Sequence, residues 1–296
     1  MRLRTGILSL VLVLLFSAGL ASGAVRDTDP VLEGKLESKL MGRTMPYHVY
    51  GPLGFREARD KKLPVVYLLH GLTGSYSDWF EKGDIEAVVK KYGVVVVMPE
   101  GNNGWYTDSP IKPNDKYESY IVKELIPKIE GDLSVRKDRA GRAIAGLSMG
   151  GYGGLKFGLK YPGKFVLAGS FSGALRAAEW DKTTVPAWKV LGESVYSAFG
   201  PKGSETRAEN DIFKILNGLE GDELKRLPFL YLDCGTEDGL IVQNRSFSEL
   251  LLKKKVPHEF RQLPGRHDWR FWHSQIGEFL ELAEGFFDAK NAVAGQ

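Results

Sequence analysis

A serine framed by glycines is the residue in this chain best placed to do chemistry. Ser148 lies in the run Gly-Leu-Ser-Met-Gly at 146–150, directly after a short apolar stretch and before a helix-compatible segment. A strand that turns sharply into a helix holds the serine between them in a strained conformation, which only small flanking residues tolerate. The pattern predicts that Ser148 is a nucleophile. Because Gly-x-Ser-x-Gly also arises by chance, its partners must support the assignment.

A serine hydroxyl becomes a good nucleophile when a base takes its proton and an acid orients that base. Where a Gly-x-Ser-x-Gly turn between strand and helix carries the nucleophile, the acid and then the histidine come later in the chain. Asp233, Glu237 and Asp238 all follow the apolar run 229–232. Asp238 is the predicted acid, because it lies far enough past the run to curl over the edge of the sheet. Asp233 is expected to bond locally to loop amides, and Glu237 is expected to be solvated.

The base must be one of the five histidines of the chain. His267 is the predicted base, because it lies in a loop between the expected last strand and the expected final helix. The other four occupy less suitable places: the early antiparallel region (His48), a position before the serine (His70), the start of the last strand (His258) and the final helix (His273).

Acyl transfer also needs two backbone donors for the oxyanion that develops on the substrate. One is the amide that follows the nucleophile, on Met149. The second should come from the loop after the first central strand, His-Gly-Leu-Thr-Gly at 70–74. Its glycines allow amides to turn inward, and the Leu72 N–H is the predicted donor.

The elements that must position these groups follow from the distribution of apolar residues. Residues 32–50 mix polar and apolar residues and predict antiparallel strands. Five short apolar runs predict buried strands, at 65–69, 94–98, 143–145, 165–168 and 229–232. Segments with helical spacing alternate with them, at 85–92, 117–129, 150–160, 245–255 and 274–287. This alternation predicts an α/β fold, with a mostly parallel central sheet and helices on both faces.

Two further segments stand apart from this alternation. Residues 1–24 carry a basic start, an apolar core and small residues at the end, which predicts a cleaved signal peptide. The apolar core is shorter than the roughly 20 residues that span a membrane. Residues 25–296 are then expected to form a single domain. Within it, residues 174–226 are polar with moderate helical character, and they form either a cap over the substrate pocket or a peripheral excursion.

Composition excludes several functions. The formal charge of +3 includes two arginines of the signal peptide, so the remaining chain carries about +1 and no nucleic-acid partner is expected. Cys234 is the only cysteine, so no internal disulfide can form, and a buried, inert thiol is expected after the apolar run. The sequence has no His-x-x-x-His or paired-cysteine spacing, so neither a metal nor another cofactor is expected.

Five ordered motifs resemble the esterase D family of α/β-hydrolases, which includes S-formylglutathione hydrolases, feruloyl and acetyl-xylan esterases, and mycolyltransferases. The motifs span nearly the whole chain after residue 24, at 67–71, 98–108, 146–153, 233–238 and 265–269. The resemblance implies the α/β-hydrolase fold and the same roles for Ser148, Asp238 and His267, with the Leu72 and Met149 amides as the oxyanion hole.

The resemblance also implies that the loop with Trp105 and Tyr106 lies beside the site. This aromatic pair would bind substrate by stacking on a sugar or aromatic acyl group, or it would pack onto the domain instead.

These observations predict a secreted or periplasmic serine carboxylesterase. Its partners would be small-molecule or polysaccharide esters with acetyl, feruloyl or short-chain acyl groups, and no stable membrane insertion is expected after signal cleavage. The export signal disfavours glutathione thioesters, whose chemistry is intracellular. Two alternatives remain: an acyltransferase that passes the acyl group to a sugar or alcohol, and a non-catalytic glycan-binding protein on the same fold.

Overall fold

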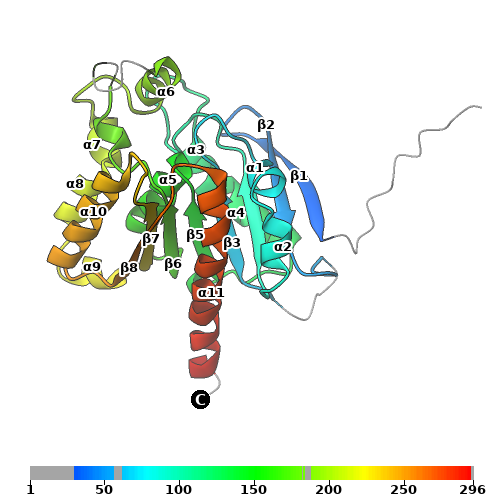
Figure 1. Ribbon diagram of the computed structural model, residues 1–296. Helices are drawn as coiled ribbons and strands as arrows, with labels where there is room; N and C mark the ends of the chain where they lie inside the picture. Colours follow the sequence, from blue (N-terminus) through cyan, green and yellow to red (C-terminus); the bar gives the residue numbers. More distant parts are fainter. Residues whose placement is uncertain (1–29, 57–61, 182, 184–187, 295–296) are drawn as a thin grey trace, which may run out of the picture.

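The computed structural model describes residues 30–56, 62–181, 183 and 188–294 (Figure 1). The signal peptide predicted at 1–24 lies outside these residues. The described chain builds an eight-stranded sheet in the order β1-β2-β4-β3-β5-β6-β7-β8. The strands are β1 (Val31–Ser38), β2 (Arg43–Tyr50), β3 (Val65–Leu69), β4 (Val95–Pro99), β5 (Arg142–Gly146), β6 (Leu167–Phe171), β7 (Phe229–Gly235) and β8 (His258–Leu263).

The sheet is mostly parallel, as predicted. β1 pairs with β2, and β2 with β4, in antiparallel register. From β4 to β8 every neighbouring pair is parallel. The strands β3, β4, β5 and β6 are buried at every residue, which is the reason their sequences are apolar or small apart from Arg142 at the start of β5. The predicted runs are therefore confirmed as strands, although β6 begins at Leu167 rather than at residue 165.

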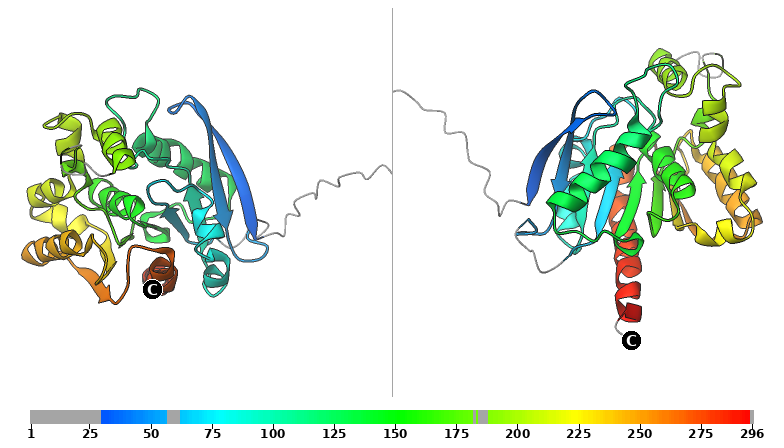
Figure 2. Two further views of the ribbon diagram at one scale, coloured as in Figure 1. Left: turned by 45° about the horizontal axis from the view of Figure 1, so that its top comes forward. Right: turned by 180° about the vertical axis from the view of Figure 1, so that it is seen from behind.

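Helices cover both faces of the sheet, as Figures 1 and 2 show from three sides. On one face, α1 (Asp78–Glu81), α2 (Ile85–Val89) and α11 (Trp269–Ala294) bury side chains such as Trp79 and Phe279. The opposite face carries α3 (Tyr117–Tyr120), a π-helical turn (Ile121–Leu125), α4 (Ile126–Asp132), α5 (Met149–Lys160) and α10 (Ile241–Lys253). This arrangement confirms the predicted α/β-hydrolase layering.

The segment 174–226 is helical where the structure describes it. It contains a 3-10 turn (Ala177–Glu179), α6 (Lys189–Phe199), α7 (Glu205–Asn210), α8 (Ile212–Gly218) and α9 (Asp222–Arg226). Helix α8 packs against α5 and α10. In Figure 1, α6 lies at the top of the molecule, beyond the carboxyl ends of the parallel strands. Helix α6 thus stands at the edge of the sheet where ligands bind in open α/β folds, whereas α9 lies near the opposite end of the strands (Figure 1).

Candidate active site

Ser148 occupies a sharp turn between β5 and α5. Its backbone has φ 54° and ψ −113°, a conformation that costs energy for a residue with a Cβ atom. Both flanking glycines are needed for close approach. A Cβ on Gly146 would lie 2.6 Å from the Gly150 carbonyl carbon, and one on Gly150 would lie 2.5 Å from the Leu69 carbonyl oxygen. The turn therefore presses the start of α5 against the end of β3.

Three side chains from distant parts of the chain form a continuous hydrogen-bonded row. His267 Nε2 lies 2.9 Å from Ser148 Oγ, and His267 Nδ1 lies 2.8 Å from Asp238 Oδ2. The second oxygen of Asp238 accepts from the Leu240 amide at 2.8 Å. Burial alone would raise the pKa of Asp238, but the hydrogen bond from His267 and the Leu240 amide lower it below its ordinary value. Asp238 is thus an ionised acceptor for the imidazole.

The parallel sheet explains why these residues meet. Ser148 follows β5, Asp238 follows β7, and His267 lies between β8 and α11. Parallel strands end at the same edge of the sheet, so loops after three of them converge there. Of the four remaining histidines, His48 lies in β2, His258 at the start of β8 and His273 within α11, while His70 directly follows β3.

The two other acid candidates do not reach the imidazole. Glu237 is exposed, as predicted. Asp233 is fully buried in β7, and both its carboxyl oxygens lack a hydrogen-bond partner among the described residues. The expectation that the Asp233 side chain bonds to loop amides is wrong, because β7 directs it into the core before the loop begins. Cys234 is fully buried, as predicted.

The predicted oxyanion donors flank the serine. Met149 is the first residue of α5, so its N–H has no carbonyl partner within the helix. Leu72 lies on the wall of a pocket of about 330 Å³ that also contains Ser148 and His267. The geometry brings both residues to the nucleophile, from β3 on one side and from α5 on the other.

A hydrogen-bond network that the sequence did not reveal fixes the loop at 70–74. The Thr73 amide donates to Asn103 Oδ1 at 2.8 Å. His70 is 1% exposed, and its Nδ1 lies 2.8 Å from the Gly71 carbonyl oxygen. Its Nε2 lies 3.1 Å from Glu100 Oε1. His70, Gly71 and Glu100 lie in the family-like motifs, yet nothing in the spacing of these motifs indicated the contacts.

Trp105 and Tyr106 pack within the domain rather than in the pocket. They are 1% and 0% exposed, and neither lines the pocket at Ser148. The Trp105 indole N–H donates to Ser194 Oγ at 2.9 Å, and the Tyr106 hydroxyl donates to the His70 carbonyl at 2.9 Å. The expectation that these side chains bind substrate is therefore corrected. Tyr106 instead secures the strand end that leads into the 70–74 loop.

A buried lysine ties the helix that follows Ser148 to the same region. Lys156 on α5 is fully buried and donates to the Tyr106 carbonyl at 2.6 Å and to Glu118 at 2.9 Å. Burial lowers the pKa of Lys156 to about 8, although the Glu118 carboxylate opposes the shift. Coulombic attraction from Lys156 and Lys160 lowers the pKa of Glu118 to about 2 against its own desolvation. The ion pair holds the loop around Tyr106 onto α5.

Tryptophans dominate the wall of the Ser148 pocket. Five apolar or aromatic side chains line it, namely Leu72, Leu147, Trp188, Trp269 and Trp272. The Trp272 ring meets His267 edge-on, with centroids 5.0 Å apart at 90°. Trp188 immediately precedes α6 and is 53% exposed. Trp188 belongs to the segment 174–226 and Trp269 to the motif at 265–269, but the sequence predicted neither as part of the pocket.

Among the residues that the structure describes, no group of three or more His, Cys, Asp or Glu side chains is arranged to hold a metal ion. None of the helices in the described ranges combines the length and apolar character needed to cross a bilayer.

The fold and the hydrogen-bonded serine, histidine and aspartate at its edge define an α/β-hydrolase. Residues 38–281 match the model of the Esterase family, and the chain belongs to this family. An acetyl esterase from Caldicellulosiruptor saccharolyticus is 30% identical over 229 residues, which cover 76% of this chain and 85% of the relative. The protein is accordingly an enzyme of the carboxylic ester hydrolase class, and the resemblance to the esterase D group is confirmed.

Solved structures agree with this assignment. A ferulic acid esterase has a TM-score of 0.73 and 28% identity, covering 86% of this chain and 98% of that chain. FphF, a fluorophosphonate-binding serine hydrolase of Staphylococcus aureus, has a TM-score of 0.77 and 26% identity over the same shares of the two chains.

Proposed function

We propose that this protein is a secreted or periplasmic serine carboxylesterase acting on small acyl or carbohydrate-linked esters. The observation that carries the proposal is the row of hydrogen bonds from Asp238 through His267 to Ser148, on a serine with positive φ. Export rests on the pattern of residues 1–24. The acyl range includes acetyl, feruloyl and short-chain groups, the first two of which appear in the names of the relatives.

In the proposed reaction, Ser148 Oγ attacks the ester carbonyl while His267 Nε2 accepts its proton. Asp238 accepts the Nδ1–H of His267 and stabilises the imidazolium that forms. The Leu72 and Met149 amides donate to the oxyanion, an interaction worth several kcal/mol in such sites. The imidazolium then protonates the departing alcohol. Water, activated by the same imidazole, releases the acid from the acyl-enzyme.

Residues 25–296 would act as one catalytic domain, with 174–226 serving as a cap. Trp188 supports the cap role, because it lies within this segment and lines the Ser148 pocket. The alternative reaction, transfer to an alcohol, shares the acyl-enzyme and differs only in what resolves it. Product analysis with a sugar acceptor present separates the two.

Replacing the nucleophile tests the proposal directly. We expect Ser148→Ala to lower kcat on 4-nitrophenyl acetate by about 10⁵-fold, because the variant cannot form an acyl-enzyme. Labelling by a fluorophosphonate should disappear at the same time. Retained activity or retained labelling in a correctly folded Ser148→Ala protein would rule out this nucleophile. Absence of labelling in the wild type would favour the non-catalytic glycan-binding alternative.

A further inference from the structure

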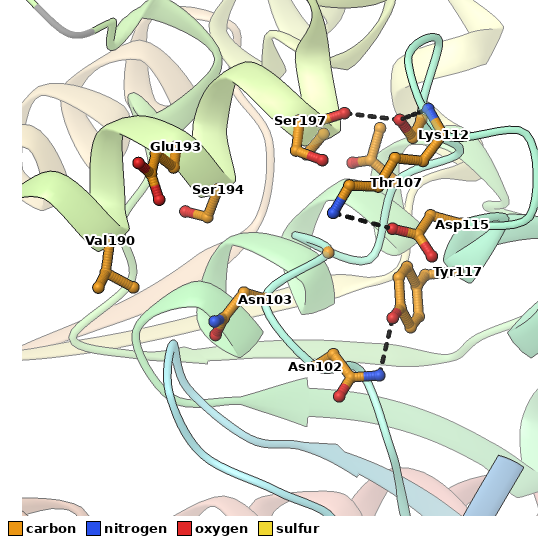
Figure 3. A pocket seen from close by; sticks show the side chains of 13 residues that line it. Asn102, Asn103, Thr107, Lys112, Asp115, Tyr117, Val190, Glu193, Ser194 and Ser197 are labelled. Atoms are coloured by element: carbon orange, nitrogen blue, oxygen red, sulfur yellow. Dashed lines mark hydrogen bonds and ion pairs between the residues drawn. The ribbon is translucent and has the colours of Figure 1, made fainter.

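A polar cavity of about 370 Å³ lies between α6 and the loop at residues 102–117, separate from the pocket at Ser148. Figure 3 shows Val190, Glu193 and Ser194 on α6 along one side, with Lys112 and Asp115 on the other. Its volume falls in the range of ligand sites, about 300–1,000 Å³. The catalytic steps described above use none of its lining side chains.

The cavity adjoins the catalytic pocket on two sides. Asn103 lines the polar cavity, and its Oδ1 accepts from the Thr73 amide at 2.8 Å, while Thr73 lines the Ser148 pocket. On the second side, Trp188 lines the Ser148 pocket and Val190, two residues later, lines the cavity. A ligand with its ester carbonyl at Ser148 could therefore extend past Asn103 along the start of α6.

The groups that line the cavity suit hydroxyl groups. Asn103 uses its oxygen for Thr73, so it offers its amide N–H donors to a ligand. The side chain of Lys112 is 63% exposed and lies 3.8 Å from Asp115. The side chain of Glu193 is 57% exposed and lies 3.8 Å from Lys189. An ammonium has three donors and a carboxylate several lone pairs, so both groups keep capacity for a ligand hydroxyl beside these ion pairs. A hydroxyl both donates and accepts, so neighbouring hydroxyls on one ring can pair with donors and acceptors in turn.

The same lining disfavours other ligands. An anion would meet the Glu193 carboxylate. Lys112, the one cationic residue among the described lining side chains, already lies 3.8 Å from Asp115, which also pairs with Arg43 at 3.0 Å. An apolar chain would leave polar groups without partners, at a cost of about 1–3 kcal/mol for each one that becomes buried. The tryptophan-rich Ser148 pocket provides the better environment for an acyl group.

We propose that the polar cavity is the subsite for the alcohol part of the ester, and that this part is an uncharged sugar ring. The assignment rests on the proposed esterase function and specifies its substrate class. The acyl group lies in the tryptophan-lined pocket at Ser148, and the sugar lies between α6 and the 102–117 loop. Asn103 stands at the junction and links sugar binding to the loop that carries Leu72.

Two acetate esters that differ only in the alcohol test this assignment: acetylated xylobiose and 4-nitrophenyl acetate. The variant Ser197→Trp places a large side chain at the cavity wall, and Ser246→Trp on α10 makes the same exchange away from it. We expect Ser197→Trp to lower kcat/KM for the sugar ester about tenfold or more relative to the aryl ester, because the sugar would lose two or three hydrogen bonds. The loss should appear mainly as a higher KM. Ser246→Trp should leave the ratio unchanged.

If Ser197→Trp does not fold, Glu193→Ala at an exposed position replaces it as the cavity variant. The same comparison of kcat/KM for the sugar ester and the aryl ester is then made, and we expect a smaller rise in KM for the sugar ester. The assignment is overturned if neither cavity variant changes the ratio, if Ser246→Trp changes it equally, or if the wild type cleaves only the aryl ester. A wild type that cleaves neither ester and resists fluorophosphonate would instead overturn the esterase function.

Discussion

The end of β7 and the loop that follows it carry two aspartates five residues apart in opposite environments. Asp233, within the strand, is fully buried, and its carboxyl oxygens have no hydrogen-bond partner in the described part of the chain. Asp238, within the loop, is 3% exposed, yet it accepts from His267 and from the Leu240 amide. Both side chains are almost inaccessible to solvent, but Asp233 lies deeper in the protein and lacks the donors that Asp238 has.

The pKa values of the two carboxyl groups are shifted in opposite directions. Burial raises the pKa of Asp233 well above its ordinary value, so the folded protein holds this proton to a higher pH than the unfolded chain does. Burial acts on Asp238 in the same direction, but its donors overcome it and lower the pKa. A carboxylate is therefore available to the imidazole only where the chain has left the strand and its backbone and side-chain donors converge.

Of the changes that test this comparison, removal of the Asp238 charge should have the largest effect, on kcat. We expect Asp238→Asn to lower kcat by about 10³–10⁴-fold, because a neutral amide no longer stabilises the imidazolium and favours the wrong tautomer of His267. Steady-state kinetics on 4-nitrophenyl acetate measure the loss. Asp233→Asn should leave kcat close to that of the wild type. A larger loss in Asp233→Asn than in Asp238→Asn would invert the assignment of the acid.

Replacement of Asp233 in β7 should have a smaller effect, on the free energy of unfolding. The raised pKa of Asp233 means that the unfolded chain releases this proton above about pH 4, whereas the folded chain retains it. Each further pH unit then lowers the free energy of unfolding by about 1.4 kcal/mol, until the pH reaches the pKa of the folded protein. Asparagine does not titrate, so Asp233→Asn should gain stability over the wild type as pH rises.

Denaturant unfolding of the two proteins between about pH 5 and pH 7 measures this divergence. Glu237→Gln is the matched control, since it removes an exposed carboxyl from the adjoining loop. Its unfolding free energy should run parallel to that of the wild type. Parallel curves for Asp233→Asn as well would contradict a protonated Asp233 in the folded state.

The smallest effect is expected at Cys234, which lies between the two aspartates. Burial raises the pKa of its thiol, with the Asp238 charge acting in the same direction. The folded protein should therefore resist iodoacetamide at mildly alkaline pH and react only in denaturant, as mass spectrometry can measure. Rapid alkylation of the folded protein would show that the end of β7 opens to solvent, and the comparison with Asp238 would lose its basis.

Much of the fold was predictable because β3 to β7 consist largely of apolar or small residues and are separated by segments with helical spacing. Ser148, Asp238 and His267 were predictable because the order of strands and loops restricts where each can stand. The Asp233 environment was not predictable, since one residue of register decides whether a side chain enters the core or the loop. Trp105 and Tyr106 were misassigned because a loop position does not reveal how deeply the domain buries a side chain.

The sequence by itself determined the sheet, the turn at Ser148 and the order of the three hydrogen-bonded residues. These depend on local periodicity, on glycines that permit close approach and on chain order. Only the tertiary structure decided that Asn103 joins the polar cavity to the loop at Leu72, and that Trp188 and α6 face the site. Such contacts join residues about 30 to 90 positions apart in the chain, and packing, not sequence spacing, determines which side chains meet.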